Sequence, residues 1–255
     1  MASGRLRSRR RRKREHDQRE SQAPHTSLIP VSERPIYTTF AWAYDLVVPS
    51  PAAPQPEEAG RLLAGRKTIV DAGCGTGRHS AFLASSGFTV TGVDASAEMI
   101  EVARSRAPDV EFVVADILSW RPPAPVDGVL CRGVLNDVVD DAQRQLALDS
   151  LHAMLRPGGL LVLSVREIEK TRTRYGREPT VTRSEGGAFF RSEGRFVGDV
   201  LVIEETISSE DARADHRFEM KPWSLTEVDE RLAAAGFTRI ERRIEGDRIV
   251  ALAMN

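Results

Sequence analysis

Ile69-Val-Asp-Ala-Gly-Cys-Gly-Thr-Gly77 is the stretch that decides the fold of this 255-residue chain. Residues 68–71 before the glycines have the apolar character of a short buried strand. Residues 76–86 after them have the apolar periodicity of a helix. Glycines between a strand and a helix allow a sharp turn and let a ligand approach the main chain closely. The stretch therefore predicts a strand–loop–helix unit whose loop contacts a ligand.

The spacing of the glycines narrows the kind of ligand. A dinucleotide-binding loop has Gly or Ala three residues after its second glycine, and here that position is Arg78. A phosphate-binding loop of the nucleotide triphosphate type would be followed by Gly-Lys-Ser/Thr, and this chain has no such sequence there. A ligand held by its pyrophosphate is therefore disfavoured.

Strand-like and helix-like segments alternate on both sides of this loop, from residue 67 to residue 166. Such alternation predicts right-handed crossovers and a parallel sheet that is covered on both faces. We expect strands at 68–71, 89–94, 110–115, 126–131 and 160–165, with helices at 76–86, 96–106 and 141–155.

The pattern changes in the last third of the chain. Residues 180–220 hold strand-like runs separated by glycines, which predicts an antiparallel insert. A helix is expected from Ser224, because Ser224 and Glu227 fit a capping box and Trp223 and Val228 fit a hydrophobic staple. Two further strand-like runs then close the chain as a hairpin around the turn Glu245-Gly-Asp.

The N-terminal part differs in charge from the remainder. Residues 1–20 hold nine basic and three acidic side chains, so that they carry a charge of +6 and the rest of the chain −7. Residues 1–30 have no apolar periodicity and are predicted to be a disordered basic tail. Residues 34–48 are aromatic and amphipathic, which predicts a short helix, and the prolines at 49–56 predict a linker.

Composition excludes several classes of protein. No apolar run reaches about 18 residues, so a membrane span is not expected. The only two cysteines, Cys74 and Cys131, cannot form a disulfide scaffold and suit the reducing cytoplasm. A structural metal site requires four closely spaced ligands, so we expect no metal.

Acidic residues stand where three of the predicted strands end, at Asp71, Asp94 and Asp116. The carboxyl ends of parallel strands form the ligand crevice of an open sheet. A carboxylate at Asp94 could accept both hydroxyls of a ribose, and one at Asp116 could accept from an adenine amino group. Together with the glycine loop, these acids favour a nucleoside that carries positive charge and no phosphate.

The glycine stretch resembles the first motif of the class I S-adenosylmethionine-dependent methyltransferases, and the resemblance is strong over residues 67–166. It implies an α/β fold, with a Rossmann-like, doubly wound, seven-stranded sheet whose last strand is antiparallel. An antiparallel β insert would follow the fifth strand. It also implies a division into a tail (1–30), a lid helix with a linker (31–56) and a methyltransferase domain (57–255) that contains the acceptor-site insert (172–222).

The same resemblance implies S-adenosylmethionine as the cofactor and assigns residues to it by position. The loop glycines and the end of the fourth strand would lie beside its methionine part. Asp94 would bind the ribose, and Met99, Asp116 and the backbone of Ile117 would surround the adenine. Tyr44 would lie over the cofactor from the lid helix. The expected cofactor-binding residues are Tyr44, Asp71, Gly73, Cys74, Gly75, Gly77, Asp94, Ala95, Met99, Asp116, Ile117, Cys131 and Arg132.

On the acceptor side, Tyr37, Asn136 and Asp137 are the expected catalytic residues, and Arg166 and His216 the expected substrate-binding residues. An amine acceptor needs a free lone pair, and a hydroxyl needs a base or a metal. Asn136 or Asp137 could orient an amine or take its proton. Arg166, at the end of the fifth strand, could hold an anionic acceptor.

We therefore predict a cytoplasmic methyltransferase of small amines or hydroxyl compounds, with specialised metabolism as one setting for it. Two alternatives stay open: an RNA methyltransferase that uses the basic tail, and a non-catalytic binding module with the same fold. The absence of an Asn/Asp-Pro-Pro-Tyr/Phe motif after the fourth strand and the acidic body both disfavour a nucleic-acid partner. The sequence does not fix the acceptor, the methylated atom or the oligomeric state.

Overall fold

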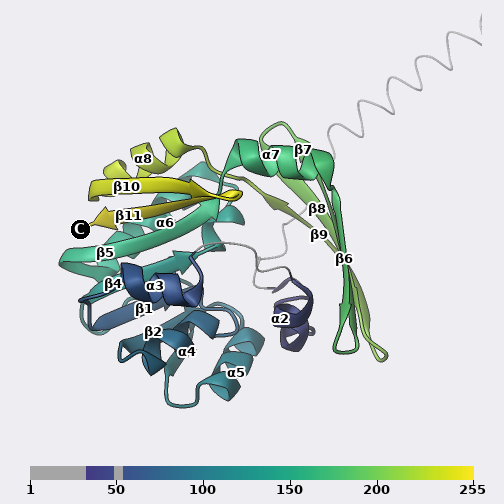
Figure 1. Ribbon diagram of the computed structural model, residues 1–255, viewed down its shortest axis with the longest axis horizontal. Coiled ribbons are helices and arrows are strands. Elements are labelled where there is room, and N and C mark those ends of the chain that lie inside the picture. Colours follow the sequence, from purple (N-terminus) through teal and green to yellow (C-terminus); the bar gives the residue numbers. More distant parts are fainter. Residues whose placement is uncertain (1–32, 49–53) are drawn as a thin grey trace, which may run out of the picture. The chain divides into compact units, whose positions relative to one another are not determined.

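Seven strands form the main sheet, in the order β10-β11-β5-β4-β1-β2-β3 (Figure 1). The computed structural model describes residues 33–48 and 54–255, so the predicted tail over 1–30 lies outside the described residues. The strands are β1 Thr68–Ala72, β2 Thr89–Asp94, β3 Glu111–Val114, β4 Val126–Arg132, β5 Leu155–Arg166, β10 Thr238–Glu245 and β11 Arg248–Met254. Strands β1 to β5 run parallel, and β11 pairs antiparallel with both β5 and β10. The predicted doubly wound, seven-stranded sheet with an antiparallel last strand is confirmed.

Helices cover both faces of this sheet. Alternate residues of β5 point to opposite faces, so that Leu161 and Leu163 contribute to one core and Leu160 and Val162 to the other. One face is covered by α6 Asp141–Met154 and α8 Leu225–Ala234, and the other by α3 Pro56–Leu62, α4 Arg78–Ser85 and α5 Ala97–Arg106. The short helix η3 Val134–Asn136 follows β4.

The insert after β5 forms a separate four-stranded antiparallel sheet, in the order β6-β7-β8-β9. Its strands are β6 Thr180–Glu185, β7 Ala188–Val197, β8 Val200–Ser208 and β9 Arg213–Met220, which confirms the predicted antiparallel insert. The helix α7 Ile168–Arg177 precedes these strands and was not expected. Five of its ten residues are charged and Thr171 is its one buried residue, so its sequence holds too few apolar residues to reveal it.

Residues 34–48 are helical only near their end and do not form the continuous helix that their aromatic pattern predicts. They form turns, then the 3-10 helix η2 Ala41–Ala43 and the four-residue helix α2 Tyr44–Val47. Pro35 has no N–H to donate, and the β-branched Thr38 and Thr39 disfavour helix, which explains the turns. Its apolar side chains pack against the second sheet, with Phe40 and Val47 in one core with Phe190, and η2 also contacts α5. Figure 1 shows α2 beside β6.

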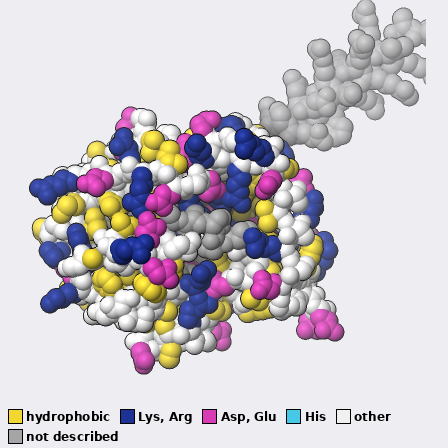
Figure 2. Space-filling view, viewed as in Figure 1, with side chains coloured by type: hydrophobic (Ala, Val, Ile, Leu, Met, Phe, Trp, Pro, Cys, Tyr) yellow, Lys and Arg dark blue, Asp and Glu magenta, His cyan; other side chains and the backbone are white. Residues whose placement is uncertain are grey.

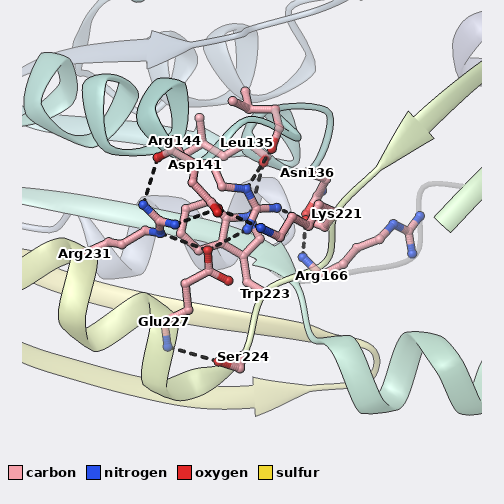
Figure 3. A network of polar contacts seen from close by, with 11 residues as sticks. Leu135, Asn136, Asp141, Arg144, Arg166, Lys221, Trp223, Ser224, Glu227 and Arg231 are labelled. Atoms are coloured by element: carbon pink, nitrogen blue, oxygen red, sulfur yellow. Dashed lines mark hydrogen bonds and ion pairs between the residues drawn. The ribbon is translucent and has the colours of Figure 1, made fainter. Parts of the chain in front are cut away.

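The start of α8 has half of the predicted capping box. The Ser224 hydroxyl accepts a hydrogen bond from the Glu227 N–H at 3.0 Å, and Trp223 and Val228 are fully buried, as expected for the staple. The Glu227 carboxylate, however, pairs with Arg144 at 2.8 Å and with Arg231 at 2.9 Å. This carboxylate therefore joins α8 to α6 in place of the return bond to Ser224 (Figure 3).

Arg144 is the centre of that junction. It is fully buried, and its guanidinium lies 4.2 Å from the centre of the Trp223 ring. It donates to the Val138 carbonyl at 2.7 Å and to the Lys221 carbonyl (Figure 3). One side chain thus holds α6 to α8 and fixes the segment that carries Trp223, which lies against the loop after β4.

We predict that Arg144→Met lowers the free energy of unfolding by about 3 kcal/mol, because it removes the buried partner of Glu227 and leaves two partly buried carbonyls without their donor. Urea unfolding followed by circular dichroism measures this change. Arg231→Met removes a partly exposed partner of the same Glu227 and should cost under about 1 kcal/mol. Equal losses in the two variants would contradict the central position of Arg144.

Candidate active site

One cavity of about 300 Å³ lies at the carboxyl ends of the main strands and is bounded on its other side by residues 34–48 and the second sheet. It brings together residues from β2, from the loops after β1, β3 and β4, and from the end of β5. The predicted site residues that line it are Tyr37, Tyr44, Gly73, Gly75, Asp94, Ala95, Met99, Asp116, Ile117, Arg132, Asn136, Asp137 and Arg166.

The glycine loop presents its backbone to this cavity. Gly73 has φ +75°, and a Cβ there would lie 2.1 Å from Val134 Cγ2, so the loop after β4 leaves no room for a side chain. Gly75 has φ +53°, and a Cβ there would meet no atom within 4 Å. The space beside Gly75 is therefore open cavity, into which a ligand can approach the main chain.

Asp94 is fixed at the end of β2 by the same loop. Its two carboxylate oxygens accept hydrogen bonds from the N–H groups of Gly75 and Ser96, each at 2.9 Å. Burial raises the pKa of Asp94, and these two hydrogen bonds act against that rise. Each oxygen keeps a further lone pair, so the carboxylate can still accept from ligand hydroxyls.

Asp116 follows β3 and lines the same end of the cavity, where its carboxylate accepts from the Leu118 N–H at 2.9 Å. Met99 and Ile117 are buried side chains that form an apolar wall between the two acids. This end of the cavity thus combines two carboxylates with an apolar surface, which suits a flat ring joined to a sugar.

Four residues predicted to bind the cofactor do not line the cavity. Asp71 is buried beneath it and accepts from the Ser80 hydroxyl at 2.6 Å, and burial raises its pKa to about 6. Cys131 lies in the core, where burial raises the pKa of its thiol to about 12. Cys74 packs beside Phe112, away from the cavity. A Cβ on Gly77 would lie 2.8 Å from Ala103 Cβ, so Gly77 allows α4 to pack closely on α5. These four residues therefore support the glycine loop and its neighbouring strands from the side away from the cavity.

His216 is also outside the cavity lining. It is half-buried on β9, and its ring stacks on Phe218 with centroids 5.9 Å apart. Phe218 lines the cavity, and His216 lies behind it, in contact with the Phe218 ring. Burial lowers the pKa of His216, and Arg34 lowers it further, which favours the neutral ring.

The loop after β4 fixes Asn136. Its side-chain oxygen accepts from the Arg166 N–H at 2.7 Å, and its side-chain nitrogen donates to the Gly133 carbonyl at 2.8 Å (Figure 3). Both ends of the amide are therefore engaged with the main chain. Asn136 lines the cavity as a residue that holds the loop in place.

Asp137, the next residue, has a different environment. Its carboxylate is buried with one oxygen 3.5 Å from Arg34, and the other oxygen has no hydrogen-bond partner among the described residues. Burial raises the pKa of Asp137 to about 6, although Arg34 and Arg166 act to lower it. A buried carboxylate oxygen without a partner is available to a ligand.

Arg34 is a site residue that sequence reasoning missed. Its guanidinium binds both carboxylate oxygens of Glu205 at 2.9 Å, donates to the Tyr37 hydroxyl at 2.9 Å and stacks on Phe218 at 3.5 Å. A signal existed in β8: Glu205 shares the buried face of the strand with Leu201, Ile203 and Ile207. A carboxylate in such a row requires a buried cation.

Residues 34–48 are tied to the main domain as well as to the second sheet. Asp45 accepts from the Thr76 hydroxyl at 2.8 Å, and the Ser96 hydroxyl donates to the Tyr37 carbonyl at 2.5 Å. Tyr37 and Tyr44 lie with ring centroids 5.8 Å apart, and burial raises the pKa of both hydroxyls. Both tyrosines therefore stay protonated near neutral pH and can donate hydrogen bonds into the cavity.

Two classes of site are absent from the part of the chain that the structure describes. No group of three or more His, Cys, Asp and Glu side chains is placed there to hold a metal ion. No described helix is long and apolar enough to cross a membrane.

Part of this chain matches known proteins in sequence. Residues 69–159, from β1 to the first half of β5, match the family described as a methyltransferase domain. A trans-aconitate 2-methyltransferase from Azoarcus sp. (strain BH72) is 40% identical over 114 residues, which cover 44% of this chain and 44% of the relative. The chain thus spans about half, or less, of the length of the curated relatives it matches.

Solved structures of low sequence identity share the fold over most of the chain. A S-adenosylmethionine-dependent methyltransferase from Clostridium acetobutylicum ATCC 824 has a TM-score of 0.72 at 17% identity, covering 85% of this chain and 97% of that one. A sugar N-methyltransferase from Streptoalloteichus sp. ATCC 53650 has a TM-score of 0.69 at 18% identity, covering 91% and 98%. Residues 69–159 therefore match a methyltransferase domain in sequence, and the chain has the fold of these S-adenosylmethionine-dependent methyltransferases.

Proposed function

We propose that this protein transfers a methyl group from S-adenosylmethionine to an amine or hydroxyl of a small molecule bound in the cavity. The observation that carries the proposal is the continuity of that cavity. It runs from the glycine loop and the acids at one end to residues 34–48 and the second sheet at the other. A cofactor and an acceptor can therefore meet in one space that is enclosed by a single chain.

The cofactor end fits S-adenosylmethionine. Asp94 is positioned to accept from the ribose hydroxyls, and Asp116 and Ile117 to meet the adenine edge. The open space beside Gly75 leaves room for the amino-acid part against the backbone. Tyr44 covers this end from the α2 side. When bound, the cofactor supplies an electrophilic methyl group on a positively charged sulfur.

The acceptor end is formed by the two parts of the chain that precede and interrupt the main domain. We assign residues 31–56 as a lid and residues 172–222 as the acceptor-site insert, because both contribute lining residues such as Tyr37, Phe190 and Phe218. The names of the relatives support a small acceptor, since one is a trans-aconitate methyltransferase and a structural neighbour is a sugar N-methyltransferase.

The chain contributes alignment, exclusion of water and one proton acceptor. Methyl transfer from a sulfonium is intrinsically favourable, so the main task is to hold the acceptor atom in line and keep water out. Asp137 takes the proton that an amine or hydroxyl loses, because its unpartnered oxygen is buried at the cavity wall. Arg34 holds Asp137 in place, and the Tyr37 hydroxyl lies beside the same guanidinium.

The face of the molecule drawn in Figure 2 gives little support to a nucleic-acid acceptor. Figure 2 shows Lys and Arg side chains interspersed with Asp and Glu over this face, without a broad basic patch. Nucleic-acid binding depends on clustered positive charge. The basic tail that motivated the RNA alternative lies outside the described residues.

We predict that Gly75→Val abolishes binding of S-adenosylhomocysteine, the product form of the cofactor, because the new side chain fills the space beside the loop. Isothermal titration calorimetry measures the loss, and circular dichroism shows that the variant is folded. Gly87→Val is the matched control, since Gly87 has φ +92° and open space around its Cβ but does not line the cavity. Wild-type protein that gives no binding heat at millimolar S-adenosylhomocysteine would refute the proposed function.

We predict a pH dependence set by Asp137. Its ionised form accepts the proton, so kcat/KM should fall as the pH is lowered through about 6. The rate at which S-adenosylhomocysteine forms, with a panel of amines, phenols and sugars as acceptors, measures kcat/KM. Asp137→Asn should lower kcat/KM by about 100-fold and remove the acid limb of the profile. The exposed Asp199→Asn should change neither, and an acid limb retained in Asp137→Asn would exclude Asp137 as the proton acceptor.

A further inference from the structure

The end of the cavity opposite Asp94 and Asp116 is strongly basic. Arg132 ends β4, Arg166 ends β5 and Arg248 begins β11, and all three line the cavity. These strands are neighbours in the sheet, and Arg166 and Arg248 are directly paired across β5 and β11. Like charges directly opposite each other destabilise a sheet. This edge therefore needs negative charge.

The described chain supplies only part of that charge. Asp247 pairs with Arg166 at 2.7 Å and with Arg174 at 2.8 Å, and both pairs use the same carboxylate oxygen. Arg174, from α7, lines the cavity as well. Asp247 thus serves Arg166 and Arg174, and no ion pair joins it to Arg248 among the described residues.

Arg248 is the member that Asp247 leaves unsatisfied. Its side chain is buried, with 7% of its surface exposed, and its Nε and Nη1 have no hydrogen-bond partner among the described residues. Its Nη1 lies 3.7 Å from where a Cβ on Gly133 would stand, so the guanidinium reaches across β5 to the loop after β4. Burial, with Arg166 and Arg132 nearby, lowers the pKa of Arg248 to about 9. A buried cation with free donors is costly unless a ligand pairs with it.

The cofactor cannot provide the missing charge by itself. Its amino-acid end carries one carboxylate, but also an ammonium, and its sulfur is positively charged. Binding S-adenosylmethionine therefore adds net positive charge to a region that is already basic. Asp137 lies near Arg166 and Arg248, and a carboxylate on the second ligand in the cavity, the acceptor, can supply the direct partner that Arg248 lacks among the described residues.

We propose that Arg248, together with Arg166, binds a carboxylate of the acceptor, so that the substrates of this enzyme are small carboxylic acids. The inference rests on the proposed methyl transfer and names its substrate class. Two coplanar N–H groups of a guanidinium match the two oxygens of a carboxylate. Apolar side chains also line this end, among them Tyr175, Phe190, Ile203 and Met220, which suits an acceptor with an unsaturated or aromatic body.

The test uses Arg248→Gln in the full chain, with Arg242→Gln as the matched control. Arg242 lies on the neighbouring strand β10, is exposed and pairs with Asp229 at 2.6 Å outside the cavity. With S-adenosylhomocysteine at saturation, calorimetry measures the binding of 4-hydroxycinnamate and of 4-aminobenzoate, which carry a hydroxyl and an amine, each alongside its methyl ester. We expect at least one acid to bind the wild type, its ester to bind at least ten-fold more weakly, and Arg248→Gln to lose at least ten-fold in affinity for that acid.

A second measurement separates the acceptor carboxylate from that of the cofactor. 5′-Methylthioadenosine lacks the amino-acid part of S-adenosylhomocysteine. The affinity for S-adenosylhomocysteine divided by that for 5′-methylthioadenosine therefore reports contacts to the amino-acid part. We expect this ratio to be the same in the wild type, Arg248→Gln and Arg242→Gln. A ten-fold fall of the ratio in Arg248→Gln alone would assign the carboxylate to the cofactor and overturn the proposal.

Three further outcomes bear on the proposal. Because the Arg248 charge is unpaired without ligand, Arg248→Gln should unfold thermally no earlier than the wild type, and earlier unfolding would make Arg248 a structural residue. If S-adenosylhomocysteine binds but neither acid does, the carboxylate proposal fails while the methyltransferase proposal stands. If S-adenosylhomocysteine itself does not bind, the proposed function fails.

Discussion

The buried contact between Arg34 and Glu205 is the interaction on which the enclosed site depends. The two residues are 171 positions apart in the sequence, and their pair joins residues 34–48 to β8 of the second sheet. Asp137, in the loop after β4, lies against the same guanidinium. Two buried carboxylates and one buried cation have little stability outside this arrangement, because each loses its hydration on burial. The cavity is thereby closed by charges that satisfy one another only when all three segments are in place.

The cofactor end could be predicted because its determinants are local. The glycine loop, Asp94 and Asp116 each stand at the end of a strand that the sequence pattern reveals. Parallel strands bring their carboxyl ends to one edge, so the topology gathers these residues without any further contact. Two strand residues expected to bind the cofactor do not line the cavity, because side chains along a strand alternate between its two faces. Asp71 and Cys131 stand at strand ends as expected, but their side chains lie behind the cavity wall.

The acceptor end could be predicted only in part, because its determinants are long-range. The sequence singled out Asp137 and Arg166, which follow strands, but gave no partner for either. Arg34 has meaning only beside Glu205, and Arg248 only beside Arg166 across the β5–β11 pair. The helix α7, which brings Arg174 to the cavity, has five charged residues among its ten and few apolar ones. Such contacts follow from packing, which the pattern along the chain does not encode directly.

The strand order also separates acidic from basic side chains along the cavity. Asp94 and Asp116 lie on the β2–β3 side of β1, and Arg132, Arg166 and Arg248 lie on the β4–β5–β11 side. Neighbouring strands are about 4.8 Å apart, so β2 and β5 are separated by about 14 Å across the glycine loop. In a cavity largely screened from water, this separation favours a ligand set that is cationic near the loop and anionic beyond it. A positively charged cofactor and an acidic acceptor satisfy that field in only one orientation, which places the acceptor on the far side of the methyl group.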